Sequence, residues 1–215
     1  MVDVKICGLS TPETVDGAIA AGASLVGLVF YPKSPRHVSL EKAAALAARA
    51  RGKARIVALI VDAGDAAIAA IGKAVKPDLF QAHGSETPER IAAIRALTDR
   101  PVIKAIKVKD ESDIAGAALY AGKASLILFD AKAPESLKHA LPGGNGLAFD
   151  WSLLGQTGKR EGFILSGGLT PQNVAAAIKV TGAPIVDVSS GVESAPGVKD
   201  LSLIRKFIEA AKRAS

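Results

Sequence analysis

The sequence has a single cysteine, Cys7, and few aromatic side chains: six Phe, two Tyr and one Trp among 215 residues. One cysteine excludes a disulfide within the chain, and a reducing compartment is then the expected location. No apolar run reaches the roughly 18 residues that a membrane-spanning helix needs. The N-terminal residues lack the charged segment and apolar core of a signal peptide. These features predict a cytoplasmic protein without membrane contact.

Basic residues are in excess but are not concentrated in one part of the chain. The 27 Lys and Arg residues outnumber the 21 Asp and Glu residues, which gives a formal net charge of +6. No dense basic run or aromatic platform accompanies them, so nucleic acid is not a predicted partner. The three histidines lack the spacing of metal ligands, and we expect neither a metal nor a cofactor. The positive balance favours a small anionic substrate.

Eight short apolar runs predict β-strands, and segments with helical periodicity lie between them. The strands are expected at 2–6, 25–30, 55–61, 79–82, 102–106, 126–130, 163–166 and 185–188, and the helices at 11–21, 40–50, 65–75, 88–97, 111–121, 150–155, 171–180 and 200–213. Strict alternation implies parallel strands joined by right-handed crossovers. Eight such units favour one domain over residues 1–215, a single (β/α)₈ TIM barrel, with an open doubly wound sheet as the alternative.

Two side chains that can move protons stand at the ends of predicted strands, where such barrels carry their chemistry. Cys7 ends the first strand and Asp130 the sixth, so a thiol and a carboxyl are candidates for the base and acid of one reaction. Lys5 shares a strand face with Cys7 and is expected to lower the thiol pKa. Burial beneath Leu126 and Leu128 is expected to raise the pKa of Asp130. The alternatives are a buried core cysteine and a helix-capping aspartate.

Candidate ligand contacts follow two other strands. Arg36 lies directly after Pro35 in the loop behind the second strand, and a constrained guanidinium suits a carboxylate. Gln81 and His83 share a face at the end of the fourth strand, where they either contact a ligand or satisfy one another.

Glycine-bearing turns occupy 143–146, 166–170 and 189–192. Glycine lets the backbone approach a ligand closely, and the predicted helix start at Thr170-Pro171 would present its amides to an anion. Loops after strands seven and eight form the phosphate site of many such barrels. The residues expected there are Gly144, Gly146, Gly167, Gly168, Ser189, Ser190 and Gly191.

Seven motifs, in family order from Lys5 to about Asp200, give the chain its resemblance to phosphoribosylanthranilate isomerases of tryptophan biosynthesis. They are Lys-Ile-Cys-Gly at 5–8, Phe-Tyr-Pro-Lys-Ser-Pro-Arg at 30–36, Gln-Ala-His-Gly at 81–84, Gly-Gly-Asn-Gly at 143–146, Phe-Asp-Trp at 149–151, Leu-Ser-Gly-Gly-Leu at 165–169 and Asp-Val-Ser-Ser-Gly-Val-Glu at 187–193. The chain departs from the family pattern at Ala82 (usually Leu), Asn145 (usually Thr) and Asp62 (expected Asn), which affects packing, a phosphate-loop hydroxyl and the charge of the third loop.

The resemblance implies an Amadori rearrangement of N-(5-phosphoribosyl)anthranilate to 1-(2-carboxyphenylamino)-1-deoxyribulose 5-phosphate. It assigns the acid to Asp130 and the base to Cys7, with Arg36 on the anthranilate carboxylate and Gln81 and His83 near the reacting sugar. A histidine-pathway Amadori isomerase is the nearest alternative, but that family has aspartate where this chain has Cys7. A non-catalytic barrel that binds sugar phosphates is the other alternative, and both a monomer and a homodimer are compatible with the sequence.

Overall fold

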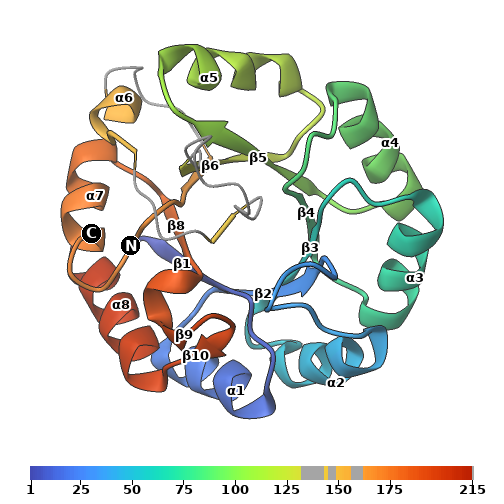
Figure 1. Cartoon of the computed structure of the whole chain (residues 1–215), viewed down its shortest axis with the longest axis horizontal. Coiled ribbons are helices and arrows are strands. Elements are labelled where there is room, and N and C mark those ends of the chain that lie inside the picture. The colour runs from blue at the N-terminus through green and yellow to red at the C-terminus, as the bar shows by residue number, and fades with distance from the viewer. Residues whose placement is uncertain (132–142, 145–148, 156–161, 215) are drawn as a thin grey trace.

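Eight parallel strands form a closed barrel in chain order, with helices around its outside (Figure 1). The computed structural model describes residues 1–131, 143–144, 149–155 and 162–214. Strand β8 pairs with β1, where Lys5 lies opposite Asp187, and this pairing closes the sheet. The predicted TIM barrel is confirmed, and the open doubly wound sheet is excluded.

The described elements follow the predicted alternation. The strands of the barrel are β1 (Asp3–Cys7), β2 (Leu25–Phe30), β3 (Arg55–Ile60), β4 (Leu79–Ala82), β5 (Val102–Val108), β6 (Leu126–Ala131), β7 (Phe163–Leu165) and β8 (Ile185–Val188). The α-helices are α1 (Pro12–Ala21), α2 (Leu40–Ala50), α3 (Asp65–Val75), α4 (Pro88–Thr98), α5 (Glu111–Gly116), α6 (Ser152–Gly155), α7 (Val174–Thr181) and α8 (Leu201–Arg213). Boundaries mostly agree with the prediction to within two residues.

Polar side chains define several helix starts. Thr11, Ser39 and Thr87 each accept a hydrogen bond from the backbone amide three residues on, and a proline opens the helices after Thr11 and Thr87. Such caps satisfy amides that have no partner inside the helix. Asp200 caps α8 in the same way, with bonds from the amides of Ser202 and Leu203.

The apolar core has an outer and an inner layer, because successive side chains of a strand point to opposite faces. Residues such as Ile6, Ile60 and Phe80 pack between the barrel and its helices. Leu25, Leu128 and others fill the barrel interior. Above them, at the carboxyl ends of the strands, the interior becomes polar. None of the described helices is long and apolar enough to cross a membrane.

Two predicted helices differ from the observed ones. Helix α7 begins at Val174 rather than at residue 171, because the Asn173 side chain accepts from the Thr170 amide and donates to the Gly168 carbonyl, which holds this segment as a loop. The predicted helix start at Thr170-Pro171 is therefore wrong. Helix α5 ends at Gly116 and continues as a 3₁₀ turn, η1 (Ala117–Tyr120), rather than as one helix to 121.

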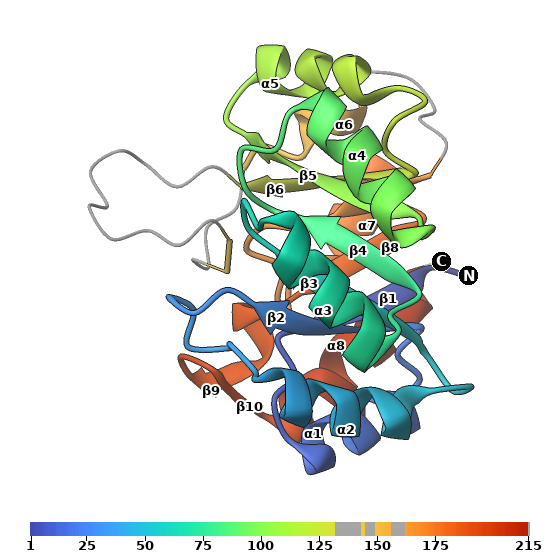
Figure 2. The ribbon, with the colours of Figure 1, turned by 90° about the vertical axis from the view of Figure 1, so that its right-hand side faces the viewer.

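An additional unit follows β8 that the periodicity did not predict. A 3₁₀ turn, η2 (Ser190–Val192), leads into a short antiparallel hairpin made of β9 (Glu193–Ala195) and β10 (Val198–Lys199). Figure 2 shows this hairpin at the end of the barrel opposite to both chain termini. It therefore lies on the face where the strands end and where the candidate residues gather.

Candidate active site

A cavity that is partly open to solvent lies at the carboxyl ends of the strands. The predicted site residues that line it are Cys7, Arg36, His83, Asp130, Gly144, Gly167, Gly168, Ser189, Ser190 and Gly191. These residues come from six different βα units, and Leu59 and Val61 at the end of β3 add a seventh. Gln81 does not line the cavity, and Gly146 and Asn145 lie outside the described residues.

Asp130, on β6, is held by a chain of hydrogen bonds that starts at Gln81 on β4. Gln81 is fully buried, and its Nε2 lies 2.9 Å from His83 Nδ1. On the other side of the ring, His83 Nε2 lies 3.1 Å from Asp130 Oδ2. The backbone amide of Ala131 donates to the other carboxyl oxygen. The hydrogen-bonded chain therefore runs from Gln81 through His83 to Asp130, and Gln81 lies beneath His83 rather than on the cavity wall.

Cys7 lies beside a buried ion pair that joins the first and last strands of the barrel. Lys5 Nζ donates to Asp187 Oδ1 over 2.9 Å, and the side chain of Lys5 is fully buried. Gly27 on β2 leaves room for both head groups, since a Cβ at this position would lie 2.9 Å from Cys7 Sγ and 3.2 Å from Lys5 Nζ. Burial lowers the pKa of Lys5, but the charges of Asp187 and Cys7 and the hydrogen bonds to both together outweigh burial and raise this pKa.

The thiol pKa is shifted in the direction opposite to the prediction. Burial raises the pKa of Cys7 above its usual value, and the Lys5 charge offsets this effect only in part. Asp187 neutralises much of the influence of Lys5 and itself raises the pKa of the thiol. The expectation of a thiol activated by Lys5 was wrong because the sequence gives no sign that Asp187 pairs with this lysine.

This shift predicts how fast Cys7 is alkylated. In the native protein the rate with iodoacetamide is expected to rise with pH through a midpoint that lies at higher pH than that of a free thiol. Only the thiolate reacts, and a raised pKa moves its formation to higher pH. Mass-spectrometric labelling across pH 6–10.5, beside N-acetylcysteine in the same buffers, measures both midpoints. If the alkylation rate of the native protein reaches its midpoint at a lower pH than the rate of N-acetylcysteine does, the raised pKa of Cys7 is contradicted.

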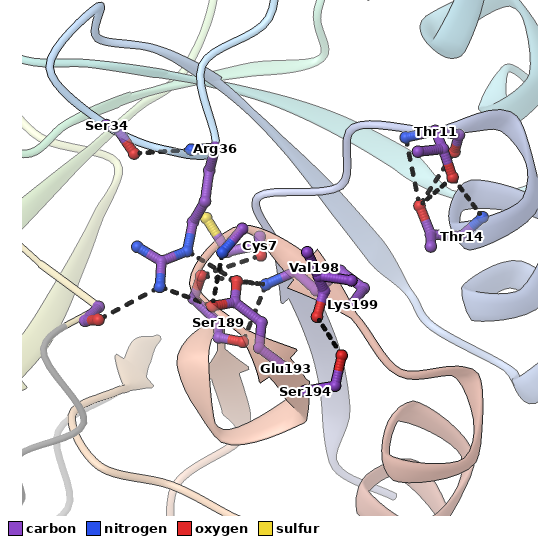
Figure 3. Close-up of polar contacts among 12 residues, drawn as sticks. Cys7, Thr11, Thr14, Ser34, Arg36, Ser189, Glu193, Ser194, Val198 and Lys199 are labelled. Atoms are coloured by element: carbon purple, nitrogen blue, oxygen red, sulfur yellow. Dashed lines mark hydrogen bonds and ion pairs between the residues drawn. The ribbon is translucent and has the colours of Figure 1, made fainter.

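Arg36 is buried, 5 % exposed, and one edge of its guanidinium is already occupied. Nε donates to Glu193 Oε1 and Nη2 donates to Glu193 Oε2, each over 2.8 Å. Nη2 also donates to the Gly144 carbonyl over 3.3 Å. Figure 3 shows Nη1 pointing away from Glu193. Gly8 makes this placement possible, because a Cβ there would lie 2.7 Å from Arg36 Cδ.

The turns after β7 and β8 pack closely against each other. Gly167 and Gly168 both have positive φ, and a Cβ on Gly191 would lie 1.9 Å from the Leu169 carbonyl oxygen. Within the described part of the chain, no hydrogen bond occupies the backbone amides of Gly168, Ser190 and Gly191. Two adjacent turns with unoccupied amides form the kind of concave surface that binds phosphate.

Two of the departures from the family pattern lie away from the cavity wall. Ala82 is fully buried in the outer core. Asp62 has φ of 47°, accepts from the Ser85 amide over 2.7 Å and lies against Gly84, where a Cβ would collide with it. Its carboxylate therefore joins the loops after β3 and β4.

Four polar residues of the site received no separate role from the sequence. Asp187 and Ser166 line the cavity, and Glu193 and Lys199 lie behind it. A charged residue inside an otherwise apolar strand, as in Ile-Val-Asp-Val at 185–188, is a signal that would have identified Asp187.

The fold and the site define a parallel (β/α)₈-barrel enzyme in which a thiol, a carboxyl and two glycine turns meet in one cavity at the carboxyl ends of the strands. The family model for N-(5'-phosphoribosyl)anthranilate isomerase matches residues 4–210, and the chain belongs to this family. Among curated relatives, the N-(5'-phosphoribosyl)anthranilate isomerase of Parvibaculum lavamentivorans is 51 % identical over 99 % of both chains. That of Rhodopseudomonas palustris (strain BisA53) is 55 % identical over 98 % of this chain and 96 % of its own.

Solved structures agree with this assignment. The phosphoribosyl anthranilate isomerase of Thermotoga maritima superposes with a TM-score of 0.88 at 38 % identity, over 99 % of this chain and 100 % of its own. A second isomerase structure, in complex with reduced 1-(o-carboxyphenylamino)-1-deoxyribulose 5-phosphate, gives 0.84 at 36 % identity over 99 % and 100 %.

Proposed function

We propose that this chain catalyses the Amadori rearrangement of N-(5'-phosphoribosyl)anthranilate, with Asp130 as the acid and Cys7 as the base. The observation that carries the proposal is the meeting of both groups in one cavity, between buried Arg36 and the two glycine turns. The substrate has an aryl carboxylate at one end and a phosphate at the other. Arg36 matches the carboxylate, and the two glycine turns match the phosphate. Binding both ends aligns the ribose with the reacting groups, which can itself contribute several kcal/mol.

The reaction needs two proton transfers and no change of oxidation state overall. Asp130 gives a proton to the ring oxygen of the ribose, the bond between this oxygen and C1 breaks, and an imine forms. Cys7 then removes the proton from C2, and the resulting enolamine tautomerises to the ketone. His83 holds Asp130 from one side, so the carboxyl keeps a fixed direction toward the cavity.

The experiment is a fluorescence assay with freshly formed phosphoribosylanthranilate. Addition of the protein is expected to cause a loss of substrate fluorescence that is proportional to protein concentration. The substrate of the histidine-pathway isomerase is the control, and no turnover of it is expected because Cys7 replaces the aspartate of that family. If the protein binds phosphoribosylanthranilate but does not turn it over at the same protein concentration, the proposal is contradicted and a binding role is favoured.

The finer aspects of the proposal concern location and assembly. We place the enzyme in the cytoplasm, where its small anionic substrate is made and a lone cysteine stays reduced. A solved structure of monomers made from the dimeric Thermotoga maritima enzyme shows that dimers occur in the family.

A further inference from the structure

Glu193 does not line the cavity, yet its carboxylate accepts four hydrogen bonds close behind it. It is the first residue of β9, and its side chain is 4 % exposed. Its Oε1 accepts from Arg36 Nε at 2.8 Å and from Lys199 Nζ at 2.7 Å. Its Oε2 accepts from Arg36 Nη2 at 2.8 Å and from the Gly197 amide at 3.2 Å. One carboxylate therefore holds two cations, Arg36 and Lys199 (Figure 3), and the turn of its own hairpin.

The two bonds to Arg36 fix the plane of the guanidinium. A bidentate contact on the Nε and Nη2 edge leaves the side chain little freedom to rotate. Nη1 then lies next to Gly144, on the cavity side. Glu193 thus decides which edge of Arg36 a ligand meets.

Lys199 extends the same network to the turn that follows β8. Its Nζ donates to the Ser189 carbonyl over 2.8 Å and to Ser189 Oγ over 3.2 Å, in addition to Glu193. Ser189 Oγ in turn donates to the Cys7 carbonyl over 3.1 Å. The group that holds Arg36 is therefore connected to the end of β1 and to a turn of the proposed phosphate site.

The hairpin itself packs on the loop that carries Arg36. Gly197, at its tip, has φ of 82°, and a Cβ at this position would lie 2.7 Å from the Pro35 carbonyl oxygen. The backbone just before Arg36 is thus in contact with the hairpin that supplies Glu193. Both the side chain and the backbone of the loop are held by one element.

We propose that Glu193 is a positioning residue that orients Arg36 toward the carboxylate of the ligand. This inference rests on the proposed function, because it assumes an aryl carboxylate at Arg36. It assigns the β9–β10 hairpin to one end of the substrate.

Two effects of removing the Glu193 charge oppose each other. A neutral residue would leave the site more positive, which attracts an anion. However, an amide in place of the carboxylate must direct an N–H group toward Arg36 or Lys199, which are themselves donors, so the bidentate contact is lost. Burial raises the free-energy cost of two donors that face each other. We therefore expect the lost orientation of Arg36 to weaken ligand binding more than the added positive charge strengthens it.

The test compares two ligands that differ only in the carboxylate. The first is reduced 1-(o-carboxyphenylamino)-1-deoxyribulose 5-phosphate, and the second is the same compound with hydrogen in place of the carboxyl group. Titration calorimetry measures both dissociation constants. Glu193→Gln is expected to weaken binding of the first ligand by about 10- to 100-fold, as for the loss of a charge-assisted contact, and to leave binding of the second almost unchanged.

The matched control is Glu209→Gln, the same substitution at an exposed residue of α8 that pairs with Arg213. It is expected to change neither constant. Equal losses for both ligands in Glu193→Gln would show a general structural role and would overturn the inference. Unchanged or tighter binding of the carboxylate ligand would overturn it as well.

A second variant covers the case in which Glu193→Gln does not fold. Glu193→Asp keeps the charge but withdraws the carboxylate by one methylene, and it is expected to produce a smaller loss with the same ligand selectivity. The wild-type protein separates this inference from the proposed function. If the wild-type protein binds the two ligands equally, Arg36 does not bind the aryl carboxylate. This part of the proposed function then fails together with the role of Glu193. If it prefers the carboxylate ligand and neither variant changes this preference, only the role of Glu193 fails.

Discussion

Replacing Cys7 with serine, or Asp130 with asparagine, is expected to lower kcat for phosphoribosylanthranilate by about 10²–10⁴-fold in each case. This loss corresponds to about 3–5 kcal/mol of activation free energy. A serine hydroxyl is a far weaker acid than a thiol, so its conjugate base is not formed at the pH of the assay. An asparagine amide has no acidic proton to give to the ring oxygen. Both substitutions preserve size, so the cavity should keep its shape.

The fluorescence assay at saturating substrate measures these effects. Asp16→Asn is the control for the second variant, because Asp16 is an exposed residue of α1 that pairs with Arg49, and it should keep the turnover of the wild type. Circular dichroism establishes that each variant is folded. Wild-type turnover by a folded Cys7→Ser protein would assign the base to another residue, and the same result for Asp130→Asn would reassign the acid.

Replacing Lys5 with methionine is expected to lower the free energy of unfolding by about 3–5 kcal/mol. Lys5 is fully buried, and its 2.9 Å bond to Asp187 is the main compensation for a carboxylate placed inside the barrel. Ser166 Oγ, at 3.4 Å, is the other side-chain donor to Asp187 within the described residues. Methionine has a similar length but no charge, so Asp187 would remain buried without its cation. Urea denaturation followed by circular dichroism measures the change.

Arg55→Met is the matched control for this prediction. Arg55 pairs with Asp3 at the surface, each side chain 47 % exposed, and such pairs contribute about 0–1 kcal/mol. The double variant Lys5→Met with Asp187→Leu removes both buried charges and should recover most of the lost stability. Equal effects of Lys5→Met and Arg55→Met would show that burial of the first pair has no energetic weight.

The barrel could be predicted because its signals are local. Each of the eight strands is a short apolar run, and caps such as Thr11-Pro12 and Thr87-Pro88 mark helix starts within a few residues. The β9–β10 hairpin could not be predicted, since its strands have three and two residues and show no periodicity. Helix α7 was misplaced because the bonds of Asn173 to Thr170 and Gly168 compete with the first helical turn.

Within the site, strand-end position identified Cys7, Asp130 and His83, and all three line one cavity. The charged pairs around these residues join positions that are distant in sequence. Lys5 and Asp187 are 182 positions apart, and Arg36 and Glu193 are 157 positions apart. A charged residue in a sequence does not state whether it will be buried or paired. For this reason the predicted direction of the shift in the Cys7 pKa was wrong, and the proposed role of Glu193 can be inferred only from the three-dimensional structure.

The contact between β1 and β8 also bears on how the chain acquires its fold during synthesis. Lys5 lies on the first strand of the barrel and its partner Asp187 on the last, 182 positions later in the chain. Until β8 has been synthesised, Lys5 therefore lacks this partner and the first strand has one open edge. The barrel can close only after that point, and an open strand edge in the incomplete chain favours aggregation.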